Sequence, residues 1–64
     1  MMDTNFAKNL RKIRLSNQLT QKDLAEKLEM NKNTIYFWEK GRCLPDLVSL
    51  RKLTKIFGNE ILNY

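Results

Sequence analysis

The chain has 64 residues, of which 42% are hydrophobic, and its 12 Lys and Arg against 7 Asp and Glu give a formal charge of +5. This composition favours one folded domain with one core over residues 1–64, and it leaves no room for a large catalytic pocket. The charge suits nucleic acid or an anionic membrane as partner, although small helical proteins also carry excess Lys for solubility. With no His and only Cys43, the sequence excludes an internal disulfide and predicts no metal site.

The first two elements are predicted to be helices. Phe6, Leu10 and Ile13 recur at helical spacing, which predicts a helix over residues 4–15 with a basic opposite face. Thr20 followed by Asp23 resembles a capping box, and the apolar residues behind it predict a second helix over residues 20–28.

A third helix is predicted over residues 31–39, after a turn of only three or four residues. Asn31 is a good N-cap, and Ile35 and Trp38 share one face. Residues 34–38 have β-like propensities, but they stand between a cap and Gly41, a helix-stopping residue. The periodicity therefore favours helix over strand.

A fourth helix is predicted between Pro45-Asp46 and Gly58, with an apolar stripe on one face. The stripe comprises Leu47, Leu50, Leu53, Ile56 and Phe57. In residues 59–64, Ile61 and Leu62 form either one more turn on the core or a frayed end. No segment has the pattern of an export signal or a membrane span, so we expect a cytoplasmic, nucleoid-associated protein with no membrane partner.

Two short helices joined by a tight turn form a helix-turn-helix, whose second helix can enter the major groove of DNA. The spaced motifs Leu19-Thr20-Gln21, Leu24-Ala25, Thr34-Ile35, Trp38-Glu39-Lys40-Gly41, Pro45 and Ile56-Phe57-Gly58 resemble the Cro and lambda-repressor-type family, often called the XRE family. The resemblance covers about residues 6–58. It implies an all-α, compact bundle of four to five helices with a lambda-repressor-like helix-turn-helix, dimeric operator recognition and transcriptional regulation.

The third helix carries the residues that we expect to read bases. Lys32 and Asn33 open the helix on the side opposite Ile35, and Tyr36 and Phe37 continue outward. Asn can pair with adenine, Lys with guanine, and an exposed aromatic ring with the thymine methyl group. For Tyr36 a phosphate contact through its hydroxyl is favoured, and Phe37 can instead be buried in the core or in a dimer contact.

Phosphate contacts are expected on either side of this helix. Gln21 lies at the start of the second helix, where an amide can donate to a phosphate, and the family uses a Gln in this way. Lys40, Gly41 and Arg42 leave the third helix and offer backbone N–H groups and two cations. Thr34 either touches a phosphate or fills space beside the backbone. By resemblance, Arg14 and Glu39 form a structural ion pair.

Three positions depart from the family pattern. Glu29 stands where the family most often has Gly, at a cost of roughly 1 kcal/mol if the backbone is left-handed. Met30 replaces the usual Val. Asn59 and Glu60 replace an apolar residue and a cap, which puts a fifth helix and the family's dimer contact in question.

The function that the sequence favours is a sequence-specific DNA-binding regulator, a repressor that occupies its operator as a homodimer. The alternative is a protein-interaction or antitoxin-like module with secondary DNA binding, in which Tyr36, Phe37, Cys43 and Leu44 form the contact surface. An enzyme is disfavoured, since the chain lacks His and recognisable catalytic motifs, and neither a cofactor nor a small-molecule substrate is expected. RNA is disfavoured because its A-form major groove does not admit a helix.

Overall fold

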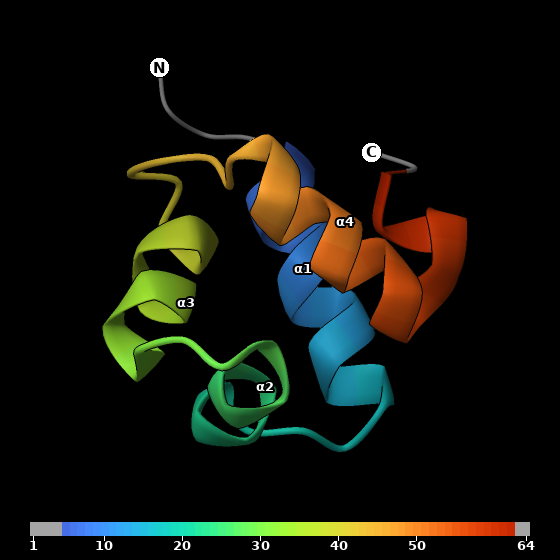
Figure 1. Cartoon of the computed structure of the whole chain (residues 1–64), viewed down its shortest axis with the longest axis horizontal. Helices are drawn as coiled ribbons and strands as arrows, with labels where there is room; N and C mark the ends of the chain where they lie inside the picture. Colours follow the sequence, from blue (N-terminus) through green and yellow to red (C-terminus); the bar gives the residue numbers. More distant parts are fainter. Residues whose placement is uncertain (1–4, 63–64) are drawn as a thin grey trace.

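The computed structural model describes residues 5–62, which form four α-helices and one 3₁₀ helix (Figure 1). The elements are α1 (Asn5–Ser16), α2 (Gln21–Leu28), α3 (Lys32–Glu39), α4 (Leu47–Phe57) and η1 (Gly58–Leu62). These residues include no strand, and the predicted all-α fold is confirmed. The predicted helix start at residue 4 and the tail residues 63–64 lie outside the described residues. The assignment of the whole chain to one domain stays a prediction.

The helices enclose one core. Helix α1 contacts α3 and η1, whereas α2 packs against α3 and α4. In Figure 1, α3 and η1 lie on opposite sides of the molecule, with α1 between them. The core consists of Phe6, Leu10, Ile13, Leu24, Ala25, Leu28, Ile35, Trp38, Leu53 and Ile61. Each of the four α-helices contributes side chains to this core. The packing of the bundle therefore fixes the position of α3.

Side-chain caps begin the helices at the predicted places. Thr20 accepts a hydrogen bond from the Asp23 N–H, and the Asp23 carboxylate accepts one from the Thr20 N–H, which completes the capping box. Asn31 caps α3 through the Asn33 N–H at 2.7 Å, and Asp46 caps α4 through the Ser49 N–H at 2.9 Å. These polar residues thus confirm the starts of α2, α3 and α4.

The first three helices end in the same way, with one residue in the left-handed conformation. That residue is Gln18 (φ 61°) after α1, Glu29 (φ 59°) after α2 and Gly41 (φ 74°) after α3. In each case the next N–H donates to a carbonyl five residues back, which is the Schellman arrangement: Leu19 to Arg14, Met30 to Ala25 and Arg42 to Phe37. The left-handed turn considered for Glu29 is confirmed, and only Gly41 has the residue type that this conformation prefers.

The apolar stripe predicted along α4 is only partly buried. Leu53 is fully buried and Leu50 and Phe57 pack against the core, but Leu47 is 72% exposed and Ile56 is also exposed. Helix α4 meets η1 and α2, which cover only part of the face that the periodicity marks as apolar.

The tail forms a turn that packs on the core, the first of the two alternatives. Element η1 is a 3₁₀ helix whose Ile61 is fully buried, while Leu62 stays exposed. The Asn9 side chain of α1 donates to the carbonyls of Glu60 at 2.9 Å and Ile61 at 3.2 Å. These bonds tie η1 to α1.

No helix within residues 5–62 combines the length and apolarity that crossing a bilayer requires.

Candidate nucleic-acid interface

Helices α2 and α3 form a helix-turn-helix joined by residues 29–31. Glu29 reverses the chain in the left-handed conformation, Met30 packs against the core, and Asn31 caps α3. Ile35 and Trp38 bury the inner face of α3, with 0% and 3% of their surface exposed. The opposite face of α3 is therefore turned away from the core along its whole length.

The outer face of α3 carries the four predicted base-reading residues. Lys32, Asn33, Tyr36 and Phe37 are all exposed, and the two aromatic side chains each retain 40% of their surface. The rings of Tyr36 and Phe37 meet edge to face, with centroids 5.7 Å apart. Burial of Phe37 in the core is thus excluded. Contact of these residues with DNA stays a prediction.

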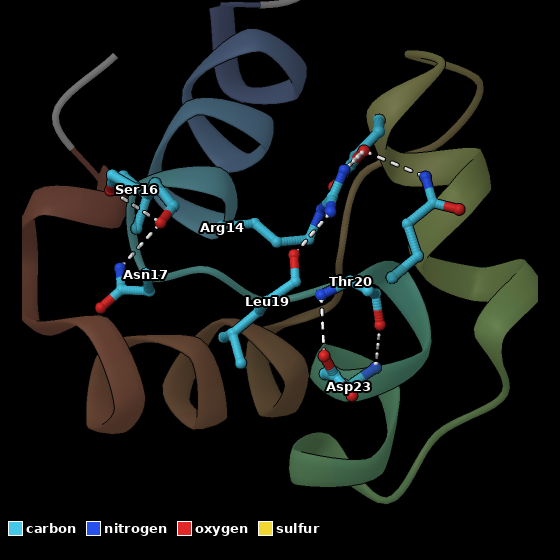
Figure 2. Close-up of polar contacts among 9 residues, drawn as sticks. Arg14, Ser16, Asn17, Leu19, Thr20 and Asp23 are labelled. Carbon is cyan, nitrogen blue, oxygen red and sulfur yellow. Dashed lines mark hydrogen bonds and ion pairs between the residues drawn. The ribbon is translucent and has the colours of Figure 1, made fainter.

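A buried ion pair locks α1 to the end of α3. Arg14 Nε donates to Glu39 Oε2 at 2.6 Å and Nη2 to Oε1 at 3.1 Å, while Nη1 donates to the Leu19 carbonyl at 2.8 Å. The side chains of Arg14 and Glu39 are only 8% and 5% exposed. Figure 2 shows Arg14 reaching from α1 to the segment before α2 and across to α3. The orientation of α3 on the bundle is therefore fixed by a two-pronged, charge-assisted contact.

Gln21 belongs to this network. Its Nε2 donates to Glu39 Oε1 at 3.1 Å, so the amide that we expected at a phosphate already has one partner in the protein. The amide carries a second N–H, which leaves room for the phosphate role. The backbone N–H groups of Gln21 and Lys22 lie at the start of α2, where helix geometry offers no internal acceptor. The start of α2 can therefore bind an anion with backbone donors as well as with the amide.

The capping box beside Gln21 holds a carboxylate in its charged form. Hydrogen bonds from the backbone and side chain of Thr20 lower the pKa of Asp23 below its ordinary value of 3.8. Figure 2 shows the two reciprocal bonds between Thr20 and Asp23 at the start of α2. The charged form of Asp23 thus helps to hold Gln21 in the first turn.

The loop after α3 offers side chains rather than backbone donors. The N–H groups of Lys40, Gly41 and Arg42 donate to the carbonyls of Tyr36, Trp38 and Phe37 at 2.9, 3.1 and 3.0 Å. The backbone N–H groups that we expected at a phosphate are therefore already paired within the Schellman turn, and phosphate contact by Lys40, Gly41 and Arg42 stays a prediction. Gly41 is buried and serves to end α3. Thr34 is half-buried. This partial burial is compatible with both roles considered for it, a phosphate contact and filling of space beside the backbone.

Two cation–aromatic contacts, not foreseen from the sequence, organise the exposed side chains. Lys40 Nζ lies 5.5 Å from the centroid of the Tyr36 ring, and the Arg42 guanidinium lies 5.8 Å from that of Phe37. The spacings of four and five residues at a helix end are the only sequence signal for them.

Residues 5–62 contain no group of three or more His, Cys, Asp or Glu side chains placed to hold a metal ion.

Comparison with known proteins agrees with this geometry. A helix-turn-helix family model matches residues 10–62. An uncharacterized HTH-type transcriptional regulator of Methanocaldococcus jannaschii is 42% identical over 52 residues, which is 81% of this chain and 79% of that protein. Multiprotein-bridging factor 1 of Debaryomyces hansenii is 39% identical over 60 residues, which is 94% of this chain and 40% of that protein.

A phage protein is also similar. The cryptic phage CTXphi transcriptional repressor RstR of Vibrio cholerae is 34% identical over 56 residues, 88% of this chain and 50% of that protein. The chain thus spans half or less of the bridging factor and of the phage repressor. No solved structure gives a significant match. The matched family model and the archaeal relative, together with the α2–α3 unit, show that the chain belongs to the XRE-type helix-turn-helix family.

Proposed function

We propose that this protein is a sequence-specific regulator that binds double-stranded DNA with α3 in the major groove and represses by occupying its operator. The observation that carries the proposal is the outer face of α3. Lys32, Asn33, Tyr36 and Phe37 are exposed, while the inner face and the Arg14–Glu39 pair hold the helix in one orientation. A rigid helix with polar and aromatic side chains on its free face suits the width of the major groove.

Two positive side chains and one amide flank this face and supply the phosphate contacts of the proposal. Lys40 and Arg42 follow α3, and Gln21 begins α2. Phosphate contacts fix the register of a protein on DNA, while base contacts give it specificity. The relatives that are named as transcriptional regulators support the same function for this chain, and its place of action is then the nucleoid.

Two copies are proposed to bind together, one at each half of a palindromic operator. A dimer of helix-turn-helix domains binds half-sites separated by about 34 Å, one turn of DNA. The test is selection of binding sites from a randomised duplex library, followed by titration of the selected duplex at several salt concentrations. We expect an inverted repeat and a steep loss of affinity with salt. Recovery of no preferred sequence would contradict the proposal.

A protein-interaction module is the second candidate, and one surface favours it. Leu44, Leu47 and Val48, at the corner between α3 and α4, are 58%, 72% and 62% exposed. Exposed neighbouring apolar side chains are a feature of protein contacts. Binding through this corner would persist at high salt, whereas DNA binding through phosphates would not, so the salt titration separates the two candidates.

A further inference from the structure

A hollow of about 280 Å³ lies where α1, the start of α2 and the end of α3 meet. We call it the α1–α3 hollow, and it is lined by Arg11, Arg14, Gln21, Tyr36, Glu39 and Lys40. Five of these six side chains are charged or carry an amide, whereas pockets for small organic ligands are lined mainly by apolar groups. The lining therefore suits an ion or a highly polar group rather than an apolar effector.

The charges of the hollow do not cancel. Glu39 is the single acid in the lining, and its two oxygens accept three hydrogen bonds from Arg14 and Gln21. The buried Arg14–Glu39 pair is neutral as a unit. Arg11 and Lys40 are exposed, and no carboxylate in residues 5–62 lies within ion-pair distance of either. Two positive charges are thus left over, which favours an anion in the hollow.

Tyr36 also lines this site, and two contacts restrain its ring. Lys40 Nζ lies over one face of its ring at 5.5 Å, and the edge-to-face contact with Phe37 restrains it further. Lys32, Tyr36 and the C-cap Lys40 are spaced one turn apart, and so are Asn33 and Phe37. The outer surface is therefore divided into two strips, and only Tyr36 and Lys40, at the C-terminal end of the first strip, border the hollow.

We propose that the α1–α3 hollow is a phosphate site for the DNA backbone, in which Arg11 and Lys40 supply charge and Tyr36 donates a hydrogen bond. The proposal rests on the DNA-binding function proposed above and names a further contact for it. It assigns Tyr36 to the backbone, the second of the two roles expected for it from the sequence, and adds Arg11, which the sequence pattern did not single out. Base reading is then concentrated in Lys32, Asn33 and Phe37.

The test compares Arg11→Ala and Tyr36→Phe with Lys55→Ala, which removes an exposed charge at the end of α4 next to η1. All three variants are first checked for an unchanged thermal melt. Each is then titrated with the selected duplex, its single-base variants and an unrelated duplex at several salt concentrations.

Arg11→Ala is expected to weaken binding to every duplex and to lower the salt slope by about 0.9, the value for one lost phosphate contact. Tyr36→Phe is expected to keep the slope and to weaken all duplexes alike by about two- to tenfold, because it removes one neutral hydrogen bond. Lys55→Ala is expected to leave affinity and slope near the parent values. Base preference stays unchanged in all three.

Three results would overturn the proposal. One is a changed base preference in Tyr36→Phe, which would make Tyr36 a base reader, and another is a salt slope in Arg11→Ala equal to that of Lys55→Ala. The third is tight binding of inorganic phosphate to the parent without DNA and its loss in Arg11→Ala, which would make the hollow a free-anion site. If the parent itself prefers no duplex, the proposed function fails instead.

Discussion

The two faces of α3 differ in what surrounds them. On the inner face, Ile35 and Trp38 are almost fully buried, and Glu39 at the helix end is hydrogen bonded to Arg14 and Gln21. On the outer face, Tyr36 and Phe37 are each 40% exposed and contact mainly one another and the neighbouring cations. Two aromatic rings on a free surface contribute little to the core.

Because its two faces are surrounded differently, a helix of eight residues serves two purposes. The inner face and the ion pair fix the helix in place, which an isolated helix of this length cannot do by itself. The outer side chains are then free to be chosen for a ligand. Substitutions on the inner face are therefore expected to change stability, and those on the outer face to change binding.

The largest effect is expected from Trp38→Ala. Removing a buried Trp side chain costs about 3 to 5 kcal/mol of unfolding free energy, because it leaves a cavity as well as losing apolar burial. The measurement is thermal or denaturant unfolding, with Phe37→Ala as the outer-face control. If Phe37→Ala lowered the unfolding free energy as much as Trp38→Ala does, the proposed distinction between the two faces would be contradicted.

A second large effect is expected from Glu39→Ala, which leaves Arg14 buried without its anion. Breaking one partner of a buried pair costs about 3 to 5 kcal/mol, far more than an exposed pair contributes. The double variant with Arg14→Met removes the stranded charge and should recover part of the loss. A Glu39→Ala protein with the parent's denaturation midpoint would show that packing alone orients α3.

A smaller effect on stability is expected from the left-handed residues that end α1, α2 and α3. Glu29→Gly is expected to stabilise the protein by about 0.5 to 1 kcal/mol, because glycine adopts the left-handed conformation without the Cβ clash. Gln18→Gly tests the same point after α1, and Gly41→Ala is the reverse change, expected to destabilise. If Glu29→Gly unfolds earlier than the parent, the Glu29 side chain makes contacts that outweigh the strain.

The smallest effect concerns pH. Since hydrogen bonds from Thr20 lower the pKa of Asp23 in the folded state, its contribution to stability is present above the ordinary value of 3.8 and is lost as pH falls through the lower folded value. Asp23→Asn should therefore destabilise near neutral pH and show a weaker acid dependence. Equal losses of stability for variant and parent between about pH 5 and strong acid would contradict this role.

Much of the fold could be predicted because its signals are local. The caps Thr20, Asn31 and Asp46 and the stop at Gly41 are visible in the sequence and stand where expected. The left-handed Gln18 could not be foreseen, since nothing in a Gln side chain favours that conformation. The exposure of Leu47 could not be predicted either. Periodicity identifies the apolar face of a helix, but it does not show which part of that face another helix covers.

The candidate site was predictable as a surface but not as a set of contacts. The outer face of α3 follows from helical spacing. The hydrogen bond of Gln21 to Glu39 depends on how α1, α2 and α3 meet, which spacing along the chain does not encode. The hydrogen bond from the Gly41 N–H to the Trp38 carbonyl likewise depends on the geometry of the helix end.

The central claim, that the outer face of α3 reads bases, is tested most directly through Asn33. Its side chain is exposed at the start of α3, and its own N–H is satisfied by Asn31, so Asn33→Ala removes only the side-chain amide. A bidentate contact to adenine is worth about 1 to 3 kcal/mol of discrimination, so affinity for the selected operator should fall about ten- to a hundredfold. The measurement is titration of parent and variant against the operator and its single-base variants at one salt concentration. We predict that the variant loses preference at one position in each half-site and keeps its affinity for unrelated DNA; a variant that keeps the parent's full preference at every position would contradict the account.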